Sequence, residues 1–270
     1  MGVPNQIADY DIVGMVADDG VVPCLHARPP ARLGAGADLV TVWLLGPVAR
    51  TSWQDIRARL EQLARARSPH LPDWLESGTG EWSGRQVFWL SGNDRAQSVL
   101  AGQALQTMSL ADRLRAVAGA ARGAHALHEQ GVLHGAICPQ AVLLVQEGRA
   151  VLAPSAVADG KRPVLQIGYP PLGYVDPQLV RGQSGRWSDI WSLGAVTRYV
   201  ASGTVPYPGI EELPVVQALT NLMQAPVPAP ADIPGPVSEL VDQCLAGDPS
   251  ARPQTASEVA DRLEQAAQAC

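Results

Sequence analysis

The chain has 270 residues, of which 46% are apolar and 17% are charged, and its formal net charge is −6. This length is enough for one large domain or two lobes with a substantial core, and the composition is ordinary for a globular protein. An acidic chain without a basic cluster is poorly suited to nucleic acid or an anionic membrane as its main partner.

Neither a membrane span nor a secretion signal is predicted. No stretch reaches the roughly 18 apolar residues of a membrane helix, and the opening MGVPNQIADYD lacks the basic and apolar regions of a signal peptide. The cysteines Cys24, Cys138, Cys244 and Cys270 form no C-x-x-C motif and no disulfide framework. We therefore expect a cytoplasmic protein with reduced cysteines.

The first ninety residues read as short strands around one helix. The runs YDIVGMV, VPCLHAR and LVTVWLL are rich in Val, Ile, Leu and Trp, which favours strands. A helix is predicted over TSWQDIRARLEQLARARS, where Ile56, Leu60 and Leu63 are spaced for one face. PDWLESG and RQVFWLSG predict two further strands on either side of a turn at 78–84.

From Ser98 the pattern becomes helical. SLADRLRAVAGAARGAHALHEQG predicts a long helix with Ser109 as its N-cap, Asp112 at the third helical position and Gly131 at its C-terminal end. Short strands are predicted at 142–145 and 150–153, before an irregular segment rich in Gly and Pro.

A second long helix, RWSDIWSLGAVTRYVASG, is largely apolar and is predicted to be buried. QAPVPAPADIPGPV, at 224–237, has too many prolines for a helix or a central strand and is predicted to be an extended surface loop. Two more helices are expected, at 236–246 and 254–268. The pattern predicts an α+β architecture with a small strand-rich lobe over 1–93 and a larger helical lobe over 94–270.

This order of elements resembles the eukaryotic-type Ser/Thr protein kinase fold over about residues 8–268. Three segments carry the likeness: SDIWSLGAVTRYVASGTVPYPG, GYVDPQL and DPSARPQTASEVADRL. They are similar to the family's buried helix, the end of its activation segment and its final motif. The resemblance implies a bilobal kinase-like fold, with a small antiparallel β-sheet and one helix in the N-lobe and a mainly helical C-lobe. The near-exclusive use of arginine over lysine indicates a bacterial, actinobacterial genome.

In the register of this resemblance, HGAICPQAVLL overlies the family's catalytic loop, and the residues that carry its chemistry are changed. Ala136 stands at the aspartate that accepts the substrate hydroxyl proton. Cys138 stands at the lysine, and Ala141 at the asparagine that binds magnesium. The family's Asp-Phe-Gly motif becomes Pro154, Ser155 and Ala156. Alanine and proline lack the side-chain oxygen that a magnesium ligand needs.

The small lobe shows the same losses. Trp43 stands at the family's strand lysine and Arg59 at the helix glutamate. The three glycines of the phosphate loop become Ala17, Asp19 and Val22. Glycine lets backbone N–H groups approach phosphates closely, so side chains at these positions are expected to prevent that approach.

Two counts support these losses in any register. Lys161 is the only lysine, so the chain cannot supply both lysines of the family. Phe88 is the only phenylalanine, and it does not lie in an Asp-Phe-Gly motif. We therefore expect no catalytic residue, no cofactor and no metal site.

The motif residues that remain are architectural. The resemblance implies that Asp189 binds the backbone of the catalytic loop, and we interpret His134 as a core histidine holding that loop. Gln178 replaces the glutamate whose family equivalent pairs with Arg252, which implies that Arg252 loses its ion pair. His125 and His128 share one helix face, and we favour a packed or solvated pair over a metal site because no ligand partner lies at suitable spacing.

The sequence thus predicts an inactive pseudokinase that serves as a protein-interaction or regulatory scaffold. A nucleotide-sensing domain that binds ATP without metal is the alternative, because the positions that the resemblance places around adenine, Cys24, Thr41 and Leu143, are not obviously blocked. An enzyme with rearranged chemistry is disfavoured by the lack of clustered carboxylates. The predicted partner surface is Thr204–Val237, where Pro206, Tyr207 and Pro208 are expected to be exposed.

Overall fold

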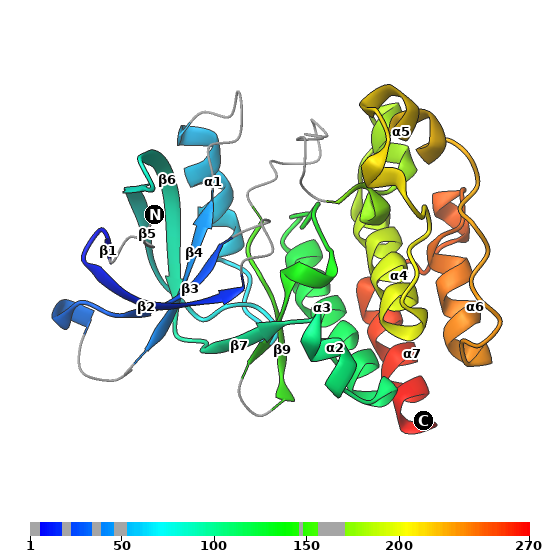
Figure 1. The fold of residues 1–270 in the computed structure, drawn as a ribbon, viewed down its shortest axis with the longest axis horizontal. Coiled ribbons are helices and arrows are strands. Elements are labelled where there is room, and N and C mark those ends of the chain that lie inside the picture. The colour runs from blue at the N-terminus through cyan, green and yellow to red at the C-terminus, as the bar shows by residue number, and fades with distance from the viewer. Residues whose placement is uncertain (1–5, 18–22, 34–38, 46–52, 146–147, 156–170) are drawn as a thin grey trace.

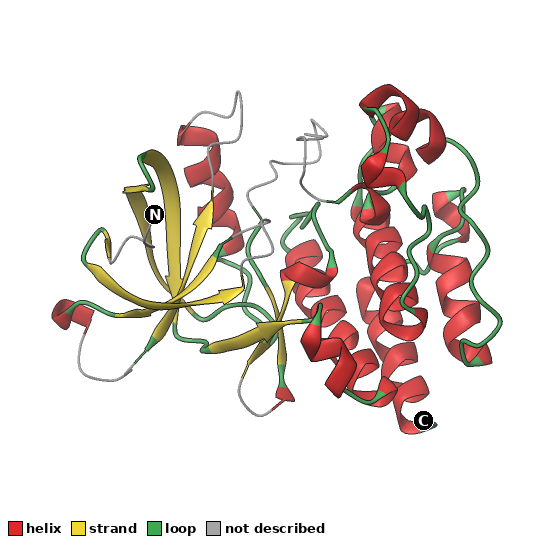
Figure 2. Cartoon of the chain, viewed as in Figure 1, coloured by secondary structure: helices red, strands yellow, loops and turns green. Residues whose placement is uncertain are grey.

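The computed structural model describes residues 6–17, 23–33, 39–45, 53–145, 148–155 and 171–270. Figure 1 shows a strand-rich lobe beside a helical lobe, with a smaller sheet between them. The same division is visible by element type in Figure 2. The α+β arrangement expected from the sequence is therefore confirmed.

The N-lobe is a six-stranded antiparallel sheet in the order β1-β2-β3-β4-β6-β5. Its strands are β1 (Gln6–Ile7), β2 (Tyr10–Ala17), β3 (Cys24–Arg28), β4 (Val40–Leu45), β5 (Trp74–Trp82) and β6 (Arg85–Gly92). Helix α1 (Trp53–Leu63) connects β4 to β5. Side chains alternate along β4: Val42 packs on the face that holds Tyr10, and Trp43 on the face that holds Leu60 of α1. This alternation gives the N-lobe two apolar layers.

The hairpin between β5 and β6 is tighter than the sequence predicted. The turn is made by Ser83 and Gly84, both with positive φ, and not by the whole of 78–84. Gly78 and Gly80 are strand residues. A Cβ at Gly78 would lie 2.7 Å from the Trp89 ring, and one at Gly80 would lie 2.6 Å from Ile7. Glycine is required there because neighbouring strands place side chains across β5.

A second sheet, in the order β7-β8-β9, joins the lobes. Its strands are β7 (Ala96–Val99), β8 (Val142–Val145) and β9 (Ala150–Leu152). The helical pattern expected from Ser98 onward is wrong at its start, because Ser98 pairs with Leu144 in the β7–β8 ladder. The strand cue is weak in a four-residue segment, AQSV, with only one large apolar side chain.

The C-lobe contains α2 (Gln103–Thr107), α3 (Leu110–Glu129), α4 (Arg186–Ser202), α5 (Val215–Leu222), α6 (Gly235–Cys244) and α7 (Ala256–Gln268). The expected cap of α3 is confirmed, since the Ser109 side chain accepts a hydrogen bond from the Asp112 N–H, and Gly131 has φ +69° just past the helix. Helix α4 is buried on most of its surface, as expected. No helix in the described ranges is long and apolar enough to span a membrane.

Candidate functional site: the loop between the lobes and its supports

A single carboxylate holds the loop that follows α3. Asp189, in the first turn of α4, accepts hydrogen bonds from the backbone N–H groups of His134 (2.8 Å) and Gly135 (2.7 Å) and from Nε2 of His128 (2.8 Å). Burial by itself raises the pKa of Asp189, but the bond from His128 and the nearby imidazoles bring it below its ordinary value. The role that the resemblance implied for Asp189 is confirmed, and His128 belongs to the same network.

His134 is a structural histidine in this loop. It is 1% exposed, and its Nε2 lies 2.8 Å from the carbonyl oxygen of Ala153, so Nε2 carries the proton and donates. Its Nδ1 accepts from the Ala136 N–H at 3.3 Å. Burial lowers the pKa of His134 to about 4, so the ring is neutral at neutral pH. Both ring nitrogens are engaged, which confirms the interpretation of a loop-holding residue.

The three altered positions of the loop lie together and are buried. Ala136, Cys138 and Ala141 are each less than 5% exposed. The Ala141 N–H donates to the Cys138 carbonyl (2.9 Å), and the Ala141 carbonyl accepts from the Ala153 N–H (2.8 Å). Burial raises the pKa of the Cys138 thiol to about 12, so it stays protonated. None of these three side chains can transfer a proton or ligate a hard cation at neutral pH.

Pro154 and Ser155 follow β9 and are buried beside this loop, which the Ala141–Ala153 bond ties to the end of that strand. Ala17 ends β2, but its side chain lies outside what the structure describes, as do the whole residues Asp19, Val22 and Ala156. The expectations for those four positions therefore stay predictions.

Arg59 crosses from the small lobe to the large one. It lies on α1, is 5% exposed, and its Nη2 donates to the carbonyl oxygens of Leu133 and, at 3.4 Å, of His134. A glutamate here could not donate to carbonyl groups, whereas a guanidinium can. Arg59 therefore fastens α1 to the same loop that Asp189 holds.

Trp43, at the position of the family's strand lysine, is fully buried. Its ring lies edge-on to Trp74 with centroids 5.7 Å apart, and it passes within 3.2 Å of where a Gly92 side chain would begin. These contacts place the indole over β6 toward β5, where it fills the core beneath α1. The described contacts therefore give Trp43 a packing role.

The residues at the metal positions do not fit a magnesium ion. Magnesium takes oxygen ligands in near-octahedral geometry, whereas Ala141 and Pro154 offer none from their side chains. In the part of the chain that the structure describes, no three His, Cys, Asp or Glu side chains gather as a potential metal site. His128 is one of the two histidines that the sequence offered as possible metal ligands, and it instead forms a hydrogen bond with Asp189.

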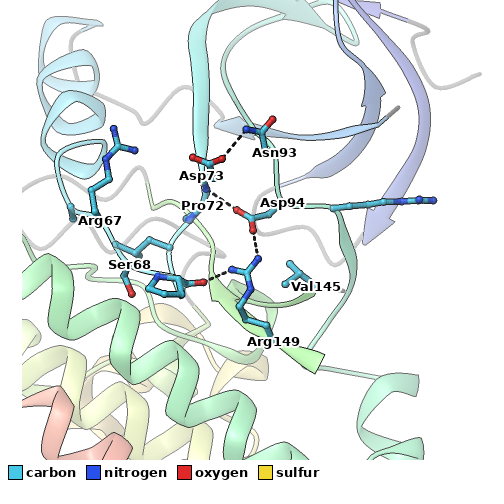
Figure 3. Close-up of a pocket in the computed structure, with 12 residues that line it drawn as sticks. Arg67, Ser68, Pro72, Asp73, Asn93, Asp94, Val145 and Arg149 are labelled. Carbon is cyan, nitrogen blue, oxygen red and sulfur yellow. Dashed lines mark hydrogen bonds and ion pairs between the residues drawn. The ribbon is translucent and has the colours of Figure 1, made fainter. Parts of the chain in front are cut away.

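A hydrogen-bonding network, which no sequence motif predicted, supports the connection between the lobes. Asp94 accepts from the Asp73 N–H (2.7 Å) and from Arg149 (2.6 Å), and its own carbonyl accepts from the Thr41 hydroxyl. Arg149 also donates to the carbonyl of Pro69. Asp73, Asp94 and Arg149 line a pocket of about 740 Å³. Figure 3 shows them, with Asp94 and Arg149 facing each other. Residues from β4, the α1–β5 connection, the β6–β7 connection and the position just before β9 are thereby joined.

The end of the activation segment departs from the expectation for Arg252. This arginine keeps a buried ion pair, made with Asp176 and not with Gln178. The Gln178 side chain instead donates to the carbonyl of Gly247 at 2.8 Å. The prediction that Arg252 loses its ion pair is therefore wrong, because a carboxylate two residues earlier reaches it.

The predicted partner surface is partly buried. Pro206 and Tyr207 are covered, contrary to expectation, while Pro208 is exposed. The Tyr207 ring stacks on Trp191 at 6.2 Å, and its hydroxyl donates to the carbonyls of Leu222 and Gln224. Residues 224–234 form neither helix nor strand and are largely exposed, as expected. The expected loop is too long at its end, because 235–237 belong to α6 and Val237 is buried.

These features together define a bilobal protein kinase-type fold, in which an antiparallel N-lobe meets a helical C-lobe at a carboxylate-braced loop. A family model described as protein tyrosine and serine/threonine kinase matches residues 95–263. Because this match covers more than half of the chain, the chain belongs to that family.

Several curated proteins are similar to the chain. Serine/threonine-protein kinase PknA of Mycobacterium tuberculosis is 28% identical over 58% of this chain and 37% of its own length. Probable serine/threonine-protein kinase PkwA of Thermomonospora curvata is 24% identical over 94% of this chain and 34% of its own length. Human mixed lineage kinase domain-like protein is 28% identical over 54% of this chain and 33% of its own length. The chain spans about a third of the length of these relatives.

Proposed function

We propose that this chain is a catalytically inactive kinase-family domain, a pseudokinase, that acts as a protein-interaction or regulatory scaffold. The observation that carries the proposal is the set of side chains at the loop between the lobes. Ala136, Ala141 and Pro154 stand where the family places its base and its metal ligands, and all three are buried in packed surroundings. Phosphoryl transfer depends almost entirely on positioning and on metal electrostatics, so these substitutions remove both requirements together.

The alternative function is metal-free nucleotide sensing. Cys24, Thr41 and Leu143, which the resemblance places around adenine, are at most 2% exposed. The Thr41 hydroxyl is already used, since it donates to the Asp94 carbonyl and accepts from the Ala96 N–H at 3.1 Å. These contacts favour the scaffold over the sensor, because a nucleotide would first have to open protein contacts.

A phosphate-transfer assay and a ligand-binding assay on the purified chain test the proposal. We expect no incorporation of radiolabelled phosphate into the chain or a generic substrate, and no rise in melting temperature with ATP, with or without magnesium or manganese. Phosphate incorporation that is lost when residues of the loop between the lobes are mutated would overturn the proposal that the chain is inactive. A melting-temperature rise with ATP alone would favour the sensor. Ala136→Asp is expected to stay inactive, because the metal ligands remain absent.

The surface that we propose for the partner is Thr204–Val237, and the lobe division at 93/94 is proposed with it. A cytoplasmic location is also part of the proposal, and it rests on the four cysteines, which are all free thiols.

Deleting the loop 225–232 would be a poor test of the Thr204–Val237 surface. Arg198 of α4 is 2% exposed and donates to the carbonyl of Val227, so the deletion would leave a buried guanidinium without that acceptor.

A further inference from the structure

The connection between β6 and β7 has a backbone edge whose polar groups are bound by side chains of the N-lobe sheet. The Thr41 hydroxyl donates to the Asp94 carbonyl and accepts from the Ala96 N–H at 3.1 Å. His26 completes the set, because its Nε2 lies 2.5 Å from the Ala96 carbonyl oxygen and therefore carries the proton that it donates. We call these three backbone groups, the Asp94 carbonyl and the Ala96 N–H and carbonyl, the 94–96 edge.

Two neighbouring strands supply the side chains that bind this edge. His26 on β3 and Thr41 on β4 are paired directly across the β3–β4 ladder, so both side chains stand on the same face of the sheet. Thr41 and Ala96 are fully buried, Asp94 is 8% exposed and His26 is partly buried. The two side chains therefore reach the edge together, as one cross-strand pair.

The 94–96 edge presents an acceptor, a donor and an acceptor in succession. Buried backbone groups of this kind need hydrogen-bonding partners. The two side chains match the pattern group for group: the Thr41 hydroxyl donates, its oxygen accepts, and the His26 ring donates. The pair thus reproduces the donor–acceptor–donor edge that a planar heterocycle such as diaminopurine carries.

The surroundings of the edge also suit a flat ring. Cys24 lies two residues before His26 on β3, on the same face of the sheet, and is 2% exposed. Cys24, Ala96 and Leu143 belong to one apolar core. Small-molecule sites combine apolar walls with a few convergent polar groups, and the 94–96 edge has both.

We infer that His26 and Thr41 act as an internal ligand, which occupies the 94–96 edge and excludes a planar heterocycle with a donor–acceptor–donor edge. Removing both side chains should expose a binding site for that class of compound. The inference rests on the proposed function, in which the intact chain binds no nucleotide, and it names the two residues that keep the edge occupied.

Three ribosides without phosphate groups test the inference on the variant Thr41→Ala combined with His26→Ala. Diaminopurine riboside matches all three groups of the edge, adenosine matches the first two, and inosine presents an acceptor and a donor in the opposite order. By calorimetry without metal, the double variant is expected to bind diaminopurine riboside at least about tenfold more tightly than inosine, because a mismatch leaves buried polar groups unpaired. Adenosine should fall between them, and the intact chain should bind none of the three.

Two conservative variants separate occupation of the edge from loss of packing. Thr41→Ser keeps the hydroxyl and is expected to leave the edge closed to all three ribosides. Thr41→Val keeps the volume but loses the hydroxyl. Hydrogen exchange of the Ala96 N–H, followed by NMR, should therefore be at least about tenfold faster in Thr41→Val than in Thr41→Ser. This comparison decides the question if the double variant does not fold.

Several results would overturn the inference. A folded double variant that binds none of the ribosides would show that Thr41 and His26 only brace the lobes. Equal affinity for the three ribosides would exclude recognition by the edge, and tight binding of diaminopurine riboside to the intact chain would show that the edge is open. Equal exchange in the two Thr41 variants would exclude its hydroxyl as the occupant. The phosphate-transfer assay on the intact chain tests inactivity separately, so the two failures are distinguishable.

Discussion

Asp176 and Arg252 form a buried ion pair that joins the end of the activation segment to the turn before α7. The Nη1–Oδ2 distance is 2.8 Å, and the side chains of Arg252 and Asp176 are 1% and 0% exposed, respectively. Arg252 also donates to the carbonyls of Ala246 and Trp187. The guanidinium thus has both a charge partner and polar acceptors, which a desolvated cation requires.

Removing either charge of this pair should destabilise the fold strongly. Asp176→Asn or Arg252→Met is expected to lower the free energy of unfolding by about 3–5 kcal/mol, because the remaining charge stays buried and unpaired. The double variant should lose less free energy of unfolding than the two single variants lose together. Urea denaturation measures all three. Gln178→Ala is the control and should cost only about 1 kcal/mol, for one hydrogen bond to Gly247. An Asp176→Asn variant no worse than this control would contradict the prediction.

Arg59 is expected to fasten the two lobes. Arg59→Ala should lower the free energy of unfolding by roughly 1.5–3 kcal/mol, the usual range for hydrogen bonds to a charged group. Faster hydrogen exchange in the loop around Leu133 and His134 should accompany the loss. Arg57→Ala, on the same helix, is the matched control. The Arg57 side chain is 70% exposed and pairs with Glu61 four residues away, so its removal should change stability by less than about 0.5 kcal/mol. Similar exchange in both variants would contradict the assignment.

The Asp94–Arg149 bridge should limit motion between the lobes. Asp94→Ala is expected to cost roughly 1–3 kcal/mol of stability, since it leaves the Asp73 N–H without its acceptor. It should also raise the rate of proteolysis near 93–96. Arg95→Ala, an exposed neighbour that keeps the bridge intact, serves as the control. If cleavage is equally fast in both, the bridge does not hold the lobes.

Stability should fall between about pH 6.5 and pH 4 because of His134. Its pKa is about 4 in the folded chain and about 6.5 in the unfolded chain, so the unfolded chain binds the extra proton first. The free energy of unfolding should therefore drop as pH falls through this window, by at most about 1.4 kcal/mol per pH unit. His134→Gln should flatten the slope of stability against pH, which urea denaturation at several pH values measures. An unaltered slope in His134→Gln would exclude His134 as its source.

The long helices were predictable because their signals are local. Ser109 and Asp112 define the start of α3 within four residues, and an apolar run defines α4. Asp94 and Arg149 are 55 residues apart, and nothing in either neighbourhood indicates the other. Pairings of this kind depend on how the elements pack, which a single sequence does not state.

The candidate site was predicted unevenly for the same reason. The roles of Asp189 and His134 came from the family's loop and are confirmed by their hydrogen bonds. The partner of Arg252 was predicted wrongly, because the motif locates a glutamate and not the nearest carboxylate. Tyr207 looked exposed between two prolines, but an aromatic ring in a turn can fold back onto a helix, here onto Trp191.

Helix α4 anchors two separate loops of the molecule. Asp189 in its first turn holds the loop between the lobes, and Arg198, nine residues later, holds Val227 on the outer loop. At about 1.5 Å per residue, some 13 Å of rigid helix separates the two anchor points. Arg198 lies in the C-terminal half of the helix whose first turn carries Asp189. The loop between the lobes and the outer loop at Val227 are therefore anchored to one continuous helix, so their separation is set by the length of that helix.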